Sequence, residues 1–235
     1  MTIEDGTAPA LRLRGIVKEY AGGVRALAGV DLTIDRGELV AIVGPSGSGK
    51  TTLLQIMGTL DRPTHGDVEI DGRDVGEASD DELSALRAHR VGFVFQQFYL
   101  LDGLPAIDNV ANGLLYTGLG QSQRRARAKE ALERVGLGHR IRHRPNELSG
   151  GERQRTAIAR ALAGHPTIVF ADEPTGNLDS RTGTEIVDLL RGLNEEGATL
   201  VVITHDREVA QSFPRQVHMR DGLIVSDGAT APVMA

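Results

Sequence analysis

A glycine-rich loop between an apolar run and a helical run is the feature that most limits how this chain can fold. The loop reads GPSGSGKTT over residues 44–52, follows LVAIV and opens TTLLQIM. It fits the spacing G-x-x-x-x-G-K-[ST] in the strand–helix setting that this motif requires. Glycines let successive backbone N–H groups converge on an anion, and the following helix adds the positive end of its dipole. The loop therefore predicts a strand–loop–helix unit that binds phosphate groups.

Individual residues of this loop have distinct expected roles. Lys50 is expected to reach the β- and γ-phosphates of a nucleotide, and the Thr51 hydroxyl to ligate Mg²⁺. A glycine-rich turn can also serve packing alone, but the match in its context favours nucleotide binding. The nucleotide-binding residues predicted here are Gly44, Pro45, Ser46, Gly47, Ser48, Gly49, Lys50, Thr51 and Thr52.

Largely apolar runs predict the sheet around this loop. They are LVAIVG (39–44), VGFVFQ (91–96), TIVFADE (167–173) and TLVVITH (199–205), and most end in a polar residue. Buried parallel strands read as continuous apolar runs, and their carboxyl ends share one edge of the sheet. The first 40 residues and GDVEIDG (66–72) show shorter β-type runs between Gly and Asp turns, which indicates an antiparallel flank.

The middle of the chain predicts helices instead. No strand pattern appears between about Gln97 and Gly164, and GERQRTAIARALAG places its apolar side chains on one face at helical spacing. These are Ala157, Ile158, Ala161 and Leu162. We therefore expect an α/β fold in one domain over residues 1–235. It would have a P-loop NTPase core with a mostly parallel sheet and an N-terminal antiparallel β flank (11–96 and 165–228), and an inserted α-helical subdomain (97–164).

Composition narrows the classes of function. The 235 residues are 40% hydrophobic and 25% charged, as expected of a soluble globular protein. A net charge of −6 argues against a dedicated nucleic-acid binder, and the lack of cysteine excludes disulfides and thiol-ligated metals. No apolar run approaches the roughly 20 residues that span a bilayer. The opening MTIEDGTAPA lacks a cationic segment before an apolar one, so we expect no secretion signal.

Two carboxylates end the run TIVFADE. Asp172 is expected at the edge of the sheet, where it would hold Mg²⁺ through water. Glu173 follows it and is expected to orient or deprotonate an attacking water molecule. An Asp-Glu pair after a strand more often caps the next helix. The P-loop is what favours the catalytic interpretation.

Two further polar residues end apolar runs. His205 ends TLVVITH, and a lone histidine there is usually a cap or a surface residue. A parallel sheet would bring it to the edge that carries the P-loop, which favours a role in sensing the γ-phosphate. Gln96 ends VGFVFQ and is expected at the same edge.

A second candidate anion site lies in NELSGGERQR (146–155), where Ser149, Gly150 and Gly151 open a helical run. The default role of a serine before a helix is to cap it. Because the helical insert separates this segment from the P-loop, we do not expect one chain to fold both onto the same phosphate. The expected arrangement is a head-to-tail pair with two-fold symmetry, in which each chain's Ser-Gly-Gly covers the other's P-loop.

In their order and spacing, these motifs resemble the nucleotide-binding subunits of ABC transporters, from about Leu11 to Gly228. The resemblance rests on the P-loop, Gln96, LSGGE, IVFADEP, NLD and TH. It implies that Gln96 is the Q-loop residue, which touches the Mg²⁺ region and lies near the membrane partner. It also implies that His205 is the switch histidine and that Asp179 is the D-loop residue, which crosses between subunits.

The same resemblance assigns the adenine contact to Tyr20, with Val24 or its neighbours packing on the base. The alternative for Tyr20 is a half-buried strand residue, although an aromatic face has general value for binding a base.

Longer segments, among them VGFVFQQFYLL and ADEPTGNLDSRTG, are similar to the macrolide-export, lipoprotein-release and cell-division ATPase group. Asp108, where the group usually has Glu, and Thr156, where an aliphatic residue is usual, depart from its pattern. The resemblance implies a hydrolase that uses ATP and Mg²⁺, pairs with a second copy, and energises a membrane permease. It would be peripheral on the cytoplasmic face of the bacterial inner membrane, without nucleic acid. The chain ends soon after VHMRDGLIVSDG, so we expect no added regulatory domain of the kind found in some sugar importers.

Other interpretations remain open. A soluble ABC-type ATPase of DNA repair or chromosome structure needs a long coiled coil between the P-loop and the LSGG signature. The roughly 100 residues between them here show no sustained heptads and cannot supply it. Translation-type ABC proteins need two such cassettes on one chain, and this sequence has only one. A nucleotide-gated module without turnover is disfavoured by Glu173 and His205. The basic runs RRAR (124–127) and RIRHR (140–144) are either lipid or permease contacts or solvated helix faces.

Overall fold

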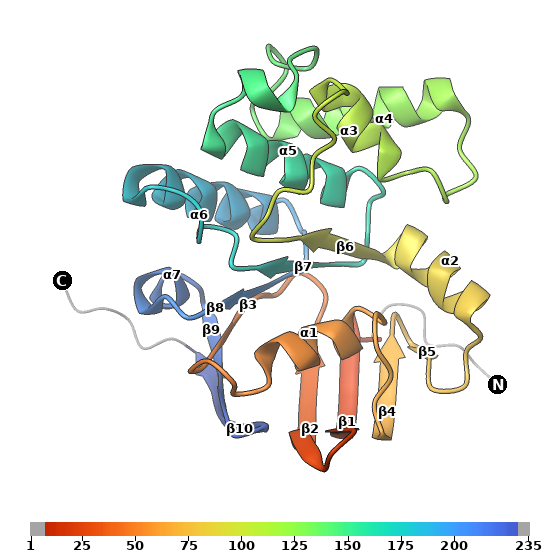
Figure 1. Cartoon of the computed structure of the whole chain (residues 1–235), viewed down its shortest axis with the longest axis vertical. Helices are drawn as coiled ribbons and strands as arrows, with labels where there is room; N and C mark the ends of the chain where they lie inside the picture. The colour runs from red at the N-terminus through yellow and green to blue at the C-terminus, as the bar shows by residue number, and fades with distance from the viewer. Residues whose placement is uncertain (1–7, 230–235) are drawn as a thin grey trace.

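Two sheets organise residues 8–229, the part of the chain that the computed structural model describes (Figure 1). The larger sheet has the strand order β10-β9-β3-β8-β7-β6, and the smaller has the order β2-β1-β4-β5. The strands of the larger sheet are β3 (Leu39–Val43), β6 (Val91–Val94), β7 (Ile168–Asp172), β8 (Leu200–Thr204), β9 (Arg215–Arg220) and β10 (Leu223–Ala229). Those of the smaller sheet are β1 (Leu11–Tyr20), β2 (Val24–Ile34), β4 (His65–Ile70) and β5 (Arg73–Asp74).

The larger sheet confirms the predicted parallel strands. β3, β8, β7 and β6 pair in parallel, so their carboxyl ends share one edge. The antiparallel pairing of β1 with β2 and β4 confirms the predicted flank. One detail of the prediction is wrong, because β6 ends at Val94 and Gln96 therefore lies beyond the strand. β9 and β10 were not predicted, since their arginines and exposed positions interrupt any continuous apolar run.

Alternate residues of the central strands bury two different helical layers. Val40 and Ile42 of β3 face the cluster that contains helix α1 (Lys50–Met57) and the smaller sheet. Ala41 and Val43 face the cluster of helices α5 (Gly150–Leu162) and α6 (Ser180–Glu195). Helices α1 and α5 therefore lie on opposite faces of the larger sheet (Figure 1).

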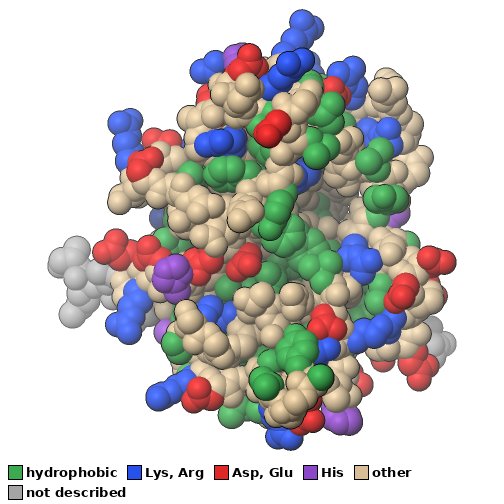
Figure 2. All heavy atoms as spheres, in the orientation of Figure 1, with side chains coloured by type: hydrophobic (Ala, Val, Ile, Leu, Met, Phe, Trp, Pro, Cys, Tyr) green, Lys and Arg blue, Asp and Glu red, His purple; other side chains and the backbone are tan. Residues whose placement is uncertain are grey.

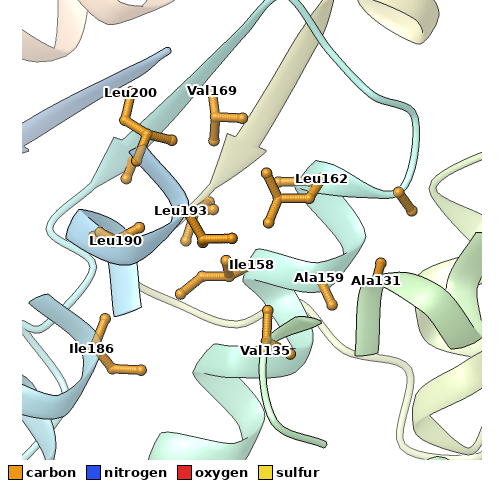
Figure 3. Close-up of a cluster of buried hydrophobic side chains, with 14 of the residues drawn as sticks. Ala131, Val135, Ile158, Ala159, Leu162, Val169, Ile186, Leu190, Leu193 and Leu200 are labelled. Carbon is orange, nitrogen blue, oxygen red and sulfur yellow. The ribbon is translucent and has the colours of Figure 1, made fainter. Parts of the chain in front are cut away.

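Only helices occur between β6 and β7: α3 (Ala106–Asn112), α4 (Gln121–Arg134), the 3₁₀ turn η1 (Pro145–Glu147) and α5. The predicted apolar face of α5 is buried along its length. Ile158 and Leu162 pack toward Leu190 and Leu193 of α6 and toward Val169 of the sheet (Figure 3). This agrees with a helical insert, whose boundaries at residues 97 and 164 stay a prediction.

Helix α2 (Asp80–Arg90), which precedes β6, was not predicted. Ser79 caps it: the Ser79 hydroxyl accepts from the Glu82 amide while the Glu82 carboxylate accepts from the Ser79 amide at 2.8 Å. Leu83 is the only buried residue of this helix, and its sequence therefore shows no apolar stripe from which the helix could be predicted. The last helix, α7 (Arg207–Gln211), follows β8 and is capped by Asp206.

Charged side chains are scattered over the face seen in Figure 2, while hydrophobic side chains gather in its middle, between the upper helices and the lower sheet. Within residues 8–229, no helix has both the length and the apolar character needed to traverse a bilayer.

Candidate active site

The P-loop leads from Val43 at the end of β3 to the first turn of α1. Gly49 caps this helix in the left-handed region, with φ of 99°, and no side chain satisfies the first amides of α1. A Cβ at Gly49 would lie 2.6 Å from the Ala26 carbonyl oxygen, and one at Gly44 would lie 2.3 Å from that of Met219. Both positions therefore require glycine, and the amides of the helix start remain free to bind an anion.

Lys50 provides the positive charge of this loop. Its Nζ donates to the carbonyl oxygens of Gly44 and Pro45, each at 2.8 Å. Burial lowers the pKa of Lys50, and this is opposed by the carboxylates of Glu173 and Asp172. The turn between β9 and β10 anchors the loop, because the Gly222 amide donates to the carbonyl oxygen of Ser48, a buried residue, at 3.1 Å. The remaining predicted residues of the loop are Pro45, Ser46, Gly47 and Thr51, which are exposed, and Thr52, which is half-buried.

Asp172 ends β7 and is half-buried. Burial raises the pKa of Asp172, the neighbouring Glu173 raises it further, and Lys50 opposes both effects. A partly desolvated carboxylate beside a P-loop suits a divalent cation, whose charge would offset the cost of burying the negative carboxylate. Among residues 8–229 no three His, Asp or Glu side chains cluster to hold a metal. Mg²⁺ would therefore need the Thr51 hydroxyl and phosphate oxygens besides Asp172, and this donor set fits it.

Glu173 occupies an unusual backbone position directly after β7. Its φ of 46° lies in the left-handed region, which costs a side-chain-bearing residue about 1–3 kcal/mol. Hydrogen bonds hold it there: its amide donates to the Ile203 carbonyl oxygen at 2.8 Å, and the Thr204 hydroxyl donates to its Oε2 at 3.1 Å. Its Oε1 accepts from the backbone amide of His205 at 2.9 Å and lies 2.6 Å from His205 Nδ1.

His205 itself is 71% exposed at the side chain, whereas the Glu173 side chain is 16% exposed. The hydrogen bond that the Glu173 carboxylate accepts from His205 raises the pKa of His205. The structure therefore brings Lys50, Asp172, Glu173 and His205 together at the predicted edge of the sheet.

Gln96 lies beside the loop that follows Glu173. Its Nε2 is 3.5 Å from Asn177 Oδ1, and Asn177 Nδ2 donates to the backbone oxygen of Gln96 at 2.8 Å. A Cβ at Gly176 would lie 2.8 Å from Gln96 Nε2. The segment after β6 and the segment after β7 are therefore joined side by side.

The LSGG segment (148–151) leads into α5, which lies on the opposite face of the sheet from α1. Ser149 caps this helix, because its hydroxyl accepts from the Glu152 amide at 3.2 Å and the Glu152 carboxylate accepts from the Ser149 amide at 2.8 Å. A Cβ at Gly151 would lie 2.5 Å from Thr182 Cγ2, and one at Gly150 would lie 3.2 Å from Leu178 Cδ2. The two glycines thus also let α5 approach α6 and the loop before it.

Tyr20 and Asp179 contact partners other than Lys50, Asp172, Glu173 and His205. Tyr20 ends β1, is 40% exposed, and donates from its hydroxyl to Asp61 Oδ2 at 3.4 Å. Lys18 Nζ lies 5.1 Å from the centre of its ring. Asp179 caps α6, accepting from the Thr182 amide at 3.0 Å and from the Thr182 hydroxyl at 2.7 Å, and these bonds lower the pKa of Asp179.

Thr204 and Asn177 were not predicted, yet their side chains bond to Glu173 and Gln96. Thr204 is adjacent to His205, and Asn177 lies two positions before Asp179, and both of these neighbours were predicted. Their side-chain partners lie across neighbouring strands or loops, so spacing along the chain gave no signal for them.

Comparison with known proteins gives consistent matches. A sequence model of the ABC transporter family matches residues 27–176. A macrolide export ATP-binding/permease protein of Paracoccus denitrificans is 50% identical over 226 residues, which cover 95% of this chain and 34% of that protein. An uncharacterised ABC transporter ATP-binding protein of Thermotoga maritima is 53% identical over 201 residues, covering 86% of each. The chain thus spans about a third of the length of the macrolide export relatives.

A solved structure is similarly close. The ATP-binding cassette MJ0796, solved as a dimer in a post-hydrolysis state bound to ADP and Pi, is 44% identical with a TM-score of 0.82. The match covers 94% of this chain and 99% of that one.

Proposed function

The chain belongs to the ABC transporter family, and from this premise we propose that it is the ATP-binding and ATP-hydrolysing subunit of a transport system. The observation that carries the proposal is the position of Glu173. It is held in a left-handed backbone conformation beside Asp172 and His205, at the sheet edge where Lys50 begins α1. A carboxylate fixed there is suited to accept a proton from water that attacks a bound γ-phosphate.

Each residue has a task in this proposal. The P-loop amides and Lys50 bind the phosphates, and Tyr20 offers an exposed aromatic face to adenine. Asp172 and Thr51, with Gln96 nearby, would hold Mg²⁺, which when bound neutralises phosphate charge. His205 orients the Glu173 carboxylate through the contact at Oε1.

The position of α5 supports a dimer with shared sites. α1, which follows the P-loop, and α5, which begins after Ser149, lie on opposite faces of the larger sheet and pack against different layers of one chain. We propose that Ser149, Gly150 and Gly151 of one copy cover the nucleotide on its partner, with Asp179 near the boundary between them. The dimeric state of the related cassette MJ0796 supports this arrangement.

The partner we propose is an integral-membrane permease, with this chain peripheral on the cytoplasmic face of the inner membrane. Relatives named for macrolide export support an export, lipoprotein-release or force-transmitting system. The alternative of an ATPase acting on nucleic acid gains no support from these relatives.

Two measurements test the proposal. Purified chain supplied with Mg²⁺ and ATP should release phosphate, and turnover no higher than that of Lys50→Ala would contradict it. Crosslinking in membranes followed by purification should recover a permease with spanning helices. Recovery of nucleic acid or of soluble proteins alone would contradict the transport assignment.

A further inference from the structure

A cavity of about 630 Å³ lies against helix α2, and no residue of the P-loop lines it. One wall is a single face of α2, formed by Glu82, Ala85, Leu86 and His89 at helical spacing. The opposite wall is the β4–β5 hairpin and the residues after it. Arg127 of α4 and the turn at Gly164 and His165, which leads into β7, complete the lining.

The floor of this cavity is apolar and belongs to the core. Ile70 is fully buried and Val75 is 7% exposed, and Leu86 packs against the same cluster. Cavities of roughly 300–1,000 Å³ with an apolar lining and a few polar groups are typical of small-molecule sites. The cavity is thus large enough for a ligand with an apolar or ring-shaped body.

Three arginines, Arg73, Arg90 and Arg127, lie in the lining of the cavity, together with two carboxylates. Arg90 is paired, with its Nε 3.2 Å from Asp71 Oδ2. The guanidinium groups of Arg73 and Arg127 have no ion pair or hydrogen bond to any residue in the described range 8–229. Arg127 is half-buried although it belongs to the basic run RRAR, so it is not simply part of a solvated face.

The two acidic residues of the lining are already engaged elsewhere. Glu82 accepts from the amide and the hydroxyl of Ser79, at 2.8 and 2.7 Å, and so caps α2. Asp74 accepts from the Gly76 amide at 2.8 Å. Neither carboxylate pairs with Arg73 or Arg127, so both guanidinium groups remain available to an anion.

We propose that this cavity binds an organic phosphate, with the phosphate between Arg73 and Arg127 and the organic part on the floor at Ile70 and Leu86. Guanidinium groups match phosphate oxygens with paired N–H donors, and two of them balance the double charge of a phosphate monoester. Helix dipoles and backbone amides are not needed here, which distinguishes this site from the P-loop.

An occupant of the cavity would join elements that otherwise meet only weakly. It would contact α2, which runs directly into β6 and then Gln96, and the turn at His165, which runs into β7 and Asp172. It would also contact Arg127 in the helical layer. A bound phosphate ester would therefore connect α4 to the two segments that lead to Gln96 and to Asp172.

Binding is tested with phenyl phosphate as the probe, by calorimetric titration of the Lys50→Ala chain, so that the P-loop does not compete. The double variant Arg73→Gln/Arg127→Gln should weaken binding about tenfold or more, because it removes both charged hydrogen-bond donors to the phosphate. The matched double variant Arg124→Gln/Arg142→Gln removes the same charge outside the cavity and should bind within about twofold of the parent. Equal binding by both double variants would overturn the proposal.

Two further measurements locate the site. Ala85→Glu puts a negative charge on the α2 wall and should weaken binding while both arginines remain. In amide NMR spectra, phenyl phosphate should shift the signals of Gly164 and Arg127 together. Shifts confined to residues 44–52, or no saturable binding to either phenyl phosphate or phospholipid, would also overturn the proposal.

Vesicles distinguish the source of the phosphate. Sedimentation with phosphatidic acid vesicles, but not with phosphatidylcholine vesicles, that is lost in Arg73→Gln/Arg127→Gln assigns the site to a lipid headgroup. Saturable binding of phenyl phosphate without vesicle binding assigns it to a soluble phosphate ester. Vesicle binding that survives in this double variant contradicts the site.

Discussion

His205 Nδ1 lies 2.6 Å from Glu173 Oε1, although the two residues are 32 positions apart in the chain. The parallel pairing of β7 with β8, with Asp172 opposite Ile203, brings them together. The contact has consequences for both catalysis and stability.

Replacing Glu173 with Gln should reduce ATP turnover by about 10²–10⁴-fold, because an amide cannot accept the proton of the attacking water. ATP binding should persist, and the bound dimer should accumulate. Phosphate release and size-exclusion chromatography with Mg²⁺ and ATP measure the two effects. A Glu173→Gln chain that turns ATP over at the parent rate would exclude Glu173 as the base.

The contact also makes stability depend on pH. Glu173 raises the pKa of His205 above its ordinary value of 6.5, so the folded state binds this proton more tightly than the unfolded state does. The resulting stabilisation is complete below pH 6.5 and is lost as pH rises through the raised pKa. The difference in Tm between the parent and His205→Ala should therefore be largest near pH 5 and shrink above neutrality. Replacement of the exposed His139 provides the control, and a difference that grows with pH would contradict the prediction.

Lys50→Ala should weaken ATP binding by about 10-fold or more, since a charged hydrogen bond contributes roughly 1.5–3 kcal/mol. Titration with a fluorescent ATP analogue measures the affinity. Lys129→Ala is the matched control, because Lys129 is exposed on α4 and its nearest acidic partner is Glu133 on the same helix. Equal affinities for the two variants would argue against phosphate contact by Lys50.

Ser149→Arg should bind ATP normally but neither dimerise nor hydrolyse it, because the bulky side chain would block the face offered to the partner. Loss of a helix cap costs about 1 kcal/mol by itself. Ser79→Arg separates the two effects, since Ser79 caps α2 through the same exchange of hydrogen bonds with a glutamate three residues on. Parent turnover by Ser149→Arg, or equal loss in both variants, would refute a shared site.

Gly151→Ala should destabilise the fold by about 1–3 kcal/mol, because the added Cβ would lie 2.5 Å from Thr182 Cγ2. Thr182→Ser removes that methyl group and should restore part of the loss. Gly192→Ala is the contrasting control: this position is in α6 with nothing within 4 Å, so alanine should stabilise the helix by about 0.5–1 kcal/mol. Urea unfolding measures all three variants, and identical effects of Gly151→Ala and Gly192→Ala would contradict the packing argument.

The sequence predicted those parts of the fold that depend on patterns along the chain. The P-loop between β3 and α1, the apolar strands and the buried face of α5 all follow from local spacing. Helix α2 escaped prediction because Leu83 is its only buried residue. β10 escaped because six of its seven residues are exposed.

The residues of the candidate site could be proposed from the sequence, but their contacts could not. Asp172 ends β7, and Glu173 and His205 directly follow β7 and β8, yet no pattern specifies that β8 lies between β3 and β7. That order decides that Thr204 and His205 meet Glu173. The left-handed backbone of Glu173 likewise depends on the bonds it makes to β8, which the local sequence does not encode.

The placement of α1 and α5 on opposite faces of one sheet has a kinetic consequence. If each chain carries two halves that belong to different sites, turnover by free protein should rise with the square of its concentration when the protein is dilute. Any scaffold that holds two copies next to each other would replace that encounter with a fixed high local concentration. Such a scaffold would accelerate the reaction without contributing a single group to its chemistry.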